Sequence, residues 1–187
     1  MTETKILPGM ISHDVEMFVV ENELKFIQNG RVASFSEFPY ALFQLLREEI
    51  KADDVVFQHL HIMHPSSEYR QIEQFAKCRF GGLDFTGDIC SETGKLQDGE
   101  YWECPLRGNC RSEGVLCKMP KIGTERITPE EIKLIQLSTT DKTNEVIAEE
   151  LDLPLGSFHK AKKKIYKKLN INTKQCLTRM AMAFNFI

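Results

Sequence analysis

The segment that most constrains the fold of this chain is residues 127–169, ITPEEIKLIQLSTTDKTNEVIAEELDLPLGSFHKAKKKIYKKL. A first helix is expected after Thr128, because this hydroxyl N-cap precedes a proline at the first helical position and lies three residues before Glu131, as in a capping box. A short second helix is expected from about Thr143, where apolar residues recur at helical spacing. Pro154 cannot lie inside a helix and indicates a turn before a third helix. The pattern predicts a helix-turn-helix.

The third helix, residues 155–169, has two chemically different sides. At about 100° per residue, Phe158, Ala161, Ile165 and Leu169 gather on one side, which can pack against the other helices. The opposite side and its flanks carry His159, Lys160, Lys163, Lys164 and Lys167.

The charge of this helix favours phosphate as its partner. A lysine-rich helix face is usually only solvated. Here, however, residues 153–187 contain seven lysines, one arginine and no acidic residue, so intrahelical ion pairs do not account for the charge. We therefore expect the third helix to lie on double-stranded DNA.

Further residues extend this pattern over four helices; they are Ile127, Thr128, Pro129, Glu131, Ile147, Ala148, Leu151, Gly156, Ser157, Ile165, Tyr166, Lys168 and Leu169. Through them, residues 127–181 resemble, without a gap, the DNA-binding domain of the LuxR/FixJ (GerE-like) transcription regulators of bacteria. The resemblance implies base contacts by His159, Lys160 and Lys163 and backbone contacts by Thr143, Asn144, Ser157 and Lys167. It also implies a homodimer on DNA, supported by the last helix.

The sequence departs from the family at several positions. Pro154 stands where the family usually has a hydroxyl cap, Ala161 where it has histidine, and Lys162 where it has an apolar residue. Lys162 is expected to lie along the packed side of the helix and to extend its amine outward. Asp152 replaces a common glycine in the turn, where aspartate tolerates a left-handed backbone better than most residues.

The net charge of −3 conceals two oppositely charged parts. Residues 121–187 contain twelve Lys and Arg against eight Asp and Glu, whereas residues 1–120 contain twelve against nineteen. Only the C-terminal part is therefore expected to attract nucleic acid. No run of about 18 apolar residues and no basic-then-apolar leader is found, so we expect a cytoplasmic protein without a membrane partner.

The N-terminal region, residues 1–77, is expected to combine a hairpin with helices. Residues 1–12 carry no clear pattern and are predicted to be loose. Short apolar–polar alternations then flank Asn29-Gly30, a strong hairpin pattern. Helices are expected after Pro39, from Asp53 and Asp54, and from Ser66 or Ser67 to about Lys77.

Five of the six cysteines lie in a glycine-rich block, residues 78–119. In the cytoplasm they are expected to be thiols, metal ligands or redox sensors rather than disulfides. A tetrahedral zinc site would supply folding energy to a segment with few apolar residues. The predicted ligands are Cys78, Cys104, Cys110 and Cys117, with Cys90 as the alternative fourth. The spacing leaves open an iron–sulfur cluster on the same ligands, or reduced and partly buried thiols.

The sequence thus predicts an α+β protein with an N-terminal hairpin-plus-helices domain that includes a Cys-rich metal-binding segment. A linker, residues 120–126, would lead to an all-α, four-helix LuxR-type domain at 127–187. The expected function is sequence-specific transcription regulation by DNA binding, with a metal-stabilised N-terminal domain. The alternative is an adaptor that docks on RNA polymerase or another regulator. No catalytic constellation is found, so an enzyme is not expected.

Overall fold

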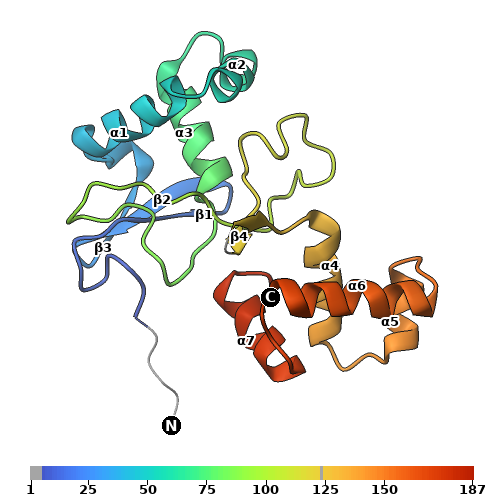
Figure 1. Ribbon diagram of the computed structural model, residues 1–187. Helices are drawn as coiled ribbons and strands as arrows, with labels where there is room; N and C mark the ends of the chain where they lie inside the picture. Colours follow the sequence, from blue (N-terminus) through green and yellow to red (C-terminus); the bar gives the residue numbers. More distant parts are fainter. Residues whose placement is uncertain (1–5, 123) are drawn as a thin grey trace. The chain divides into compact units, whose positions relative to one another are not determined.

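The computed structural model describes residues 6–122 and 124–187. The chain divides into two compact units, Met1–Lys118 (unit 1) and Met119–Ile187 (unit 2) (Figure 1). The fold is mixed α and β, as predicted. Residues 1–5 of the predicted loose segment 1–12 lie outside the described residues. Residue 123 of the predicted linker also lies outside them.

Unit 1 contains a three-stranded antiparallel sheet with the strand order β1-β2-β3. The strands are β1 (Glu16–Val20), β2 (Glu23–Gln28) and β3 (Arg31–Ser34). Between β2 and β3, Asn29 and Gly30 adopt φ values of 52° and 74°. Two successive left-handed residues match the twist of the flanking strands, so the predicted hairpin turn is confirmed.

Four helical segments follow the sheet; they are η1 (Phe35–Glu37), α1 (Tyr40–Lys51), α2 (Asp54–Met63) and α3 (Glu68–Arg79). The side chain of Asp53 caps α2 by accepting hydrogen bonds from two backbone N–H groups, and the Ser67 hydroxyl caps α3 by accepting one, from Arg70 N. These starts were predicted, but α3 extends beyond Lys77. Cys78 therefore lies on the last turn of a regular helix, which fixes its position.

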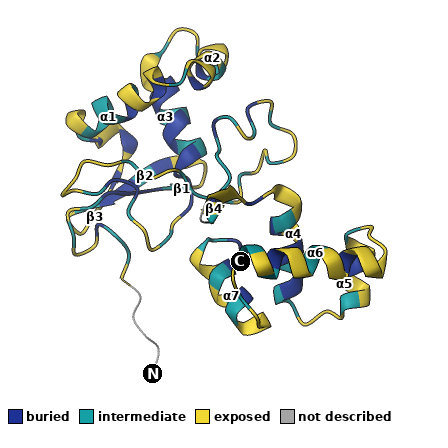
Figure 2. Ribbon diagram, viewed as in Figure 1, coloured by how far each residue is buried: buried dark blue, intermediate teal, exposed yellow. Residues whose placement is uncertain are grey.

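The core of unit 1 lies between the helices and the sheet, where both are dark blue in Figure 2. Its most deeply buried apolar residues are Met17, Leu24, Phe35, Leu46, Leu60, Ile72, Phe75, Phe80, Ile89 and Leu116. Ile89 and Leu116 come from the irregular chain that follows α3. That chain is therefore part of the same core.

The irregular chain also folds back onto β1. Val15 and Ile89 exchange two backbone hydrogen bonds, of 3.0 and 3.1 Å. The returning chain leaves three successive residues buried, Val15, Glu16 and Met17. Because successive side chains of a strand point to opposite faces, both faces of β1 are covered here. Glu16 is consequently a buried carboxylate.

Unit 2 begins with a short antiparallel strand pair, β4 (Lys121–Ile122) and β5 (Glu125–Arg126). The range predicted as a linker, 120–126, thus contains regular hydrogen-bonded structure. Ile127 N donates to the carbonyl of Pro120 and closes this pair.

Four helices complete unit 2; they are α4 (Pro129–Thr139), α5 (Asn144–Glu150), α6 (Leu155–Lys168) and α7 (Lys174–Ala183). The predicted capping box is confirmed, because Thr128 Oγ1 accepts from Glu131 N and the Glu131 carboxylate accepts from Thr128 N. Asp152 has a φ of 52°, as expected for the turn between α5 and α6. No helix of the described chain is both long enough and apolar enough to cross a bilayer.

Candidate functional site

The outer face of α6 carries the residues that the sequence predicted to contact DNA. Phe158 and Ile165 are buried on the inner side of the helix. The exposed residues of the outer side and first turn are Ser157, His159, Lys160, Lys163, Lys164 and Lys167. The amphipathic division of this helix is therefore as predicted (Figure 2).

Two groups of lysines in unit 2 differ in their contacts, whereas Lys133 on α4 is exposed and belongs to neither group. One group makes contacts within the unit. Lys142 pairs with Glu150, Lys168 pairs with Glu131, and Lys174 donates to the carbonyl of Thr140.

The other group is on α6 and consists of Lys160, Lys163, Lys164 and Lys167. No ion pair joins any of these four ammonium groups to a residue of the described chain. Four positive charges therefore project from one helix without local neutralisation. Such a face is an electrostatic site for a polyanion.

Two of the predicted backbone-contacting residues have structural roles at the start of α5. Thr143 is the N-cap of α5, and its hydroxyl accepts from Val146 N. The Asn144 side-chain oxygen accepts a 2.9 Å hydrogen bond from Lys162 Nζ, whose ammonium also lies 5.5 Å from the centre of the Phe158 ring. Lys162 therefore lies along the packed side, as expected, and burial lowers its pKa. Asn144 keeps its amide group for other contacts.

The second candidate site is a cavity of about 650 Å³ in unit 1, beside the last turn of α3. Its walls include all four predicted metal ligands, Cys78, Cys104, Cys110 and Cys117. Cys90, the alternative ligand, is not among the lining residues. The fold thus brings one thiol from a helix to three thiols from the irregular chain, which sequence spacing alone did not require.

The cysteine sulfurs stand further apart than in a closed metal site. A tetrahedral ion with four Zn–S bonds of about 2.3 Å needs sulfurs about 3.8 Å apart. Within the described residues, no three of the cysteine sulfurs lie within 4.8 Å of one another. The cavity has the right donor chemistry, and the cysteine-bearing chain would have to move closer to Cys78 to complete a tetrahedron.

The Cys78 thiol is tuned by this environment. Burial, and to a smaller extent the electrostatic effect of Cys117, Cys104 and Cys110, raises its pKa to about 11. The Gln74 amide opposes this effect by donating a 3.2 Å hydrogen bond to the sulfur. The thiolate form of Cys78 is therefore disfavoured unless a cation lies beside it.

The chain that carries Cys104 and Cys110, residues 102–113, is held in place by side-chain contacts that the sequence did not predict. We call this segment the cysteine loop. Arg107 donates to the carbonyl of Trp102 at 2.9 Å and lies 3.5 Å from the Glu113 carboxylate. Glu113 in turn accepts the Gly108 amide at 2.7 Å. These contacts fix the loop on both sides of Cys104 and Cys110. The arginine was visible in the sequence, but its partners could not be assigned from spacing.

Trp102 packs against the chain that follows α3. A Cβ on Gly81 would lie 2.5 Å from the Trp102 ring, so only glycine permits this approach. The indole Nε1 is buried without a hydrogen-bond partner among the described residues. The remaining cysteines, Cys90 and Cys176, lie elsewhere, and hydrogen bonds from Thr93 and Thr173 respectively lower their pKa values.

Comparisons with protein families, with curated proteins and with solved structures found no match to the chain. The resemblance to LuxR/FixJ regulators rests on the residues quoted for it in the sequence.

Proposed function

We propose that the protein is a sequence-specific DNA-binding transcription regulator that places α6 in the major groove. The observation that carries this proposal is the group of four α6 lysines without ion pairs, next to His159. In a helix-turn-helix, the second helix of the motif contributes base contacts from its N-terminal part. His159 and Lys160 occupy the N-terminal half of α6, and Lys163, Lys164 and Lys167 follow toward its end.

The backbone-contacting group in this proposal comprises Thr143, Asn144, Ser157 and Lys167. Thr143 and Asn144 lie at the start of α5, where the positive end of the helix dipole favours phosphate. Ser157 lies in the first turn of α6 and is exposed. Phosphate contacts from two helices would set the register of α6, so that its lysines reach base edges.

We further propose that unit 1 is stabilised by zinc held by Cys78, Cys104, Cys110 and Cys117. The shared cavity supports this set over one that includes Cys90. Zinc would favour the thiolate forms and draw the loop onto the end of α3. An iron–sulfur cluster uses the same ligands and would add redox sensitivity.

The test is binding of the full chain to duplex DNA, first with a random duplex pool to obtain the preferred site and then with that site over a range of salt concentrations. We expect log Kd to rise with log salt with a slope of about 3 to 4 per chain, because about four lysines displace counterions. The charge-matched variants are Lys160→Ala on α6 and Lys133→Ala on the exposed side of α4. Only the first should weaken binding by tenfold or more.

The alternative function is that of an adaptor that docks on RNA polymerase or another regulator. A groove of about 400 Å³ in unit 2, lined by Leu134, Leu151, Leu153 and Ile165 among others, gives this alternative a physical basis. Absence of salt-dependent duplex binding, together with a stable complex with polymerase, would establish the adaptor and refute the DNA-binding proposal. A dimer on DNA is expected from the resemblance, and binding to two half-sites would test it.

A further inference from the structure

We propose that Glu16, Asp84 and Glu100 form a binding site for a hard divalent cation of the Ca²⁺ or Mg²⁺ class. The proposal concerns a second metal site, chemically distinct from the cysteine cavity, and it does not depend on DNA binding. It arises from the way in which the chain after α3 covers β1.

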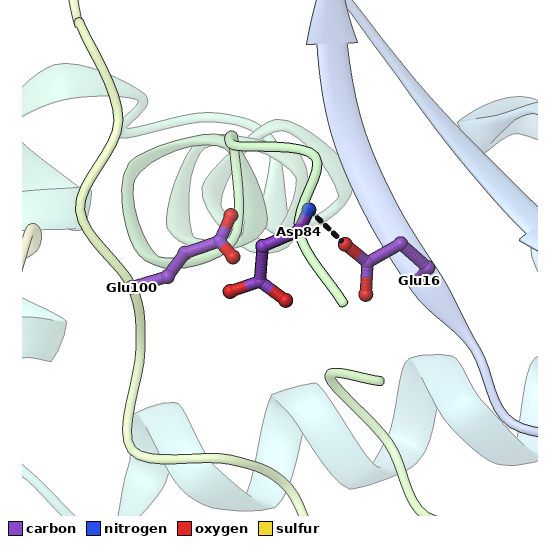
Figure 3. A group of neighbouring side chains, drawn as sticks. All are labelled: Glu16, Asp84 and Glu100. Atoms are coloured by element: carbon purple, nitrogen blue, oxygen red, sulfur yellow. Dashed lines mark hydrogen bonds between the residues drawn. The ribbon is translucent and has the colours of Figure 1, made fainter. Parts of the chain in front are cut away.

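The geometry brings three carboxylates together from distant parts of the sequence. Glu16 belongs to β1. Asp84 and Glu100 belong to the irregular chain that follows α3, one before and one after Ile89 (Figure 3). One oxygen of each lies within 4.8 Å of the other two. Three oxygens at such separations can share one ion at about 2.3–2.6 Å, the usual Ca²⁺–oxygen distance.

Backbone amides hold two of these carboxylates in place. The amide of Asp84 donates a 2.8 Å hydrogen bond to Glu16 Oε1, drawn as the dashed line in Figure 3, and the amide of Gly82 donates to Glu100 Oε1. Each of these two carboxylates thus uses one oxygen for the backbone. The second oxygen of Glu16 stays available to a ligand, whereas the Glu100 carboxyl also interacts with the Asp84 carboxylate.

The second oxygen of Glu16 provides an independent indication of a ligand. Glu16 is 0% exposed, and its Oε2 atom has no hydrogen-bond partner among the described residues. No donor among the described residues lies within hydrogen-bonding distance of this buried oxygen, and the nearby Asp88 amide only partly offsets the burial of the carboxylate.

The charge balance points the same way. A fourth carboxylate, Asp88, is buried beside the three and accepts the Met17 amide at 2.6 Å. In the described chain, the charged groups that act electrostatically on these carboxylates are the other members of the cluster.

A cation at the centre satisfies all of these groups at once. It would contact the orphaned Glu16 oxygen and neutralise the mutual repulsion of the carboxylates. Asp84 and Glu100 are partly exposed, so water can reach the ion and complete its coordination. An all-oxygen donor set selects a hard ion, whereas the cysteine cavity selects a soft or borderline ion such as zinc.

The test is calorimetric titration of CaCl₂ and, separately, MgCl₂ into the full-length chain as purified and freed of loosely bound ions by dialysis. We expect one ion per chain from at least one of the two titrations, together with an increase in the melting temperature. A stronger response to CaCl₂ would indicate a flexible site with many ligands, and a stronger response to MgCl₂ a compact octahedral one. Absence of heat and of a melting shift with both ions would overturn the proposal.

Two variants identify the residues involved. Glu16→Gln keeps the shape of the side chain and removes its charge, and it should reduce the affinity for the ion at least tenfold. Glu49→Gln makes the same chemical change on the exposed side of α1 and should leave the affinity unchanged. Should Glu16→Gln not fold, Glu100→Gln at the more accessible position serves instead. Unchanged affinity in the folded variant would refute the assignment.

Discussion

The Lys168 ammonium lies 2.7 Å from the Glu131 carboxylate, and the same carboxylate accepts the Thr128 amide at 3.0 Å. The side chains of Lys168 and Glu131 are only 9% and 13% exposed. This contact joins the last turn of α6 to the first turn of α4. The contact therefore helps to fix the position of α6, which carries Lys160, Lys163, Lys164 and Lys167, relative to α4.

Replacing Glu131 with Gln should lower the free energy of unfolding of unit 2 by about 2 kcal/mol, because Lys168 would stay buried without its main partner. Gln can still accept the Thr128 amide, so the change isolates the ion pair from the capping box. Urea denaturation followed by circular dichroism measures the difference.

The matched control for this prediction is Glu150→Gln, which breaks the exposed pair between Glu150 and Lys142. Its side chains are 37% and 39% exposed, so the loss should stay below about 1 kcal/mol. Equal losses of unfolding free energy in the two variants would show that the Glu131–Lys168 pair stabilises unit 2 no more than an exposed pair does.

Lys163 and Lys167 should differ in their effect on DNA binding, although both are exposed on α6. If Lys163 reads a base, Lys163→Ala should cost about 1–3 kcal/mol on the preferred site and relax the choice of base at one position. If Lys167 contacts phosphate, Lys167→Ala should weaken all duplexes alike and reduce the salt slope by about 1. Anisotropy titrations with the preferred site and with single-base variants distinguish the two. Identical behaviour of the two variants would contradict this division of roles.

Metal content should follow the cysteines that line the cavity. Cys110→Ser should release the bound metal and lower the melting temperature, because removal of one ligand opens the tetrahedral site. Cys90 lies outside the cavity, so Cys90→Ser should keep the bound metal and the wild-type melting temperature. Elemental analysis with an absorption spectrum, on protein purified without oxygen, measures the outcome. About one zinc per chain and no visible colour is expected, whereas iron with a broad visible band would identify a cluster. Metal loss in Cys90→Ser alone would reject the proposed ligands.

The helices of unit 2 could be predicted because their determinants are local. The capping box at Thr128 and Glu131, and the left-handed turn at Asp152, depend on residues within a few positions of one another. The same applies to the Asn29-Gly30 hairpin. The partners of Lys168 and Lys162 were not predictable, since they depend on how α6 packs against α4 and α5.

The sequence predicted that Cys78 and the three later cysteines share one site. The geometry of that site depends on contacts between residues far apart in the chain, so it could not be predicted. The acidic cluster was not predicted at all. Glu16 lies in a short strand whose outer face would ordinarily meet water. Only the return of the chain at Ile89 buries it and brings Asp84 and Glu100 to it. Such a site has no sequence spacing from which it could be recognised.

The buried carboxylates also predict how stability depends on pH when no divalent cation is present. The folded-state pKa of Glu16 is raised to about 8 and that of Glu100 to about 10, both above the ordinary value of 4.5. Folding therefore favours their protonated forms. Their contribution is complete below about pH 4.5 and is lost as the pH rises through the folded-state values, by up to about 1.4 kcal/mol per pH unit for each proton. Unfolding midpoints at about pH 6 and pH 9 should thus show a less stable protein at pH 9.

Millimolar CaCl₂ or MgCl₂ should reduce this loss, because an ion that binds the deprotonated carboxylates replaces the proton as their counter-charge. Glu16→Gln should show a shallower pH dependence without added ion, since one of the titrating groups has been removed. The exposed control Glu49→Gln should follow the wild-type curve. A protein that is equally stable at both pH values without added ion would contradict the raised pKa values. A pH-dependent loss that neither ion reduces would leave protons as the only counter-charge and exclude the cation from this cluster.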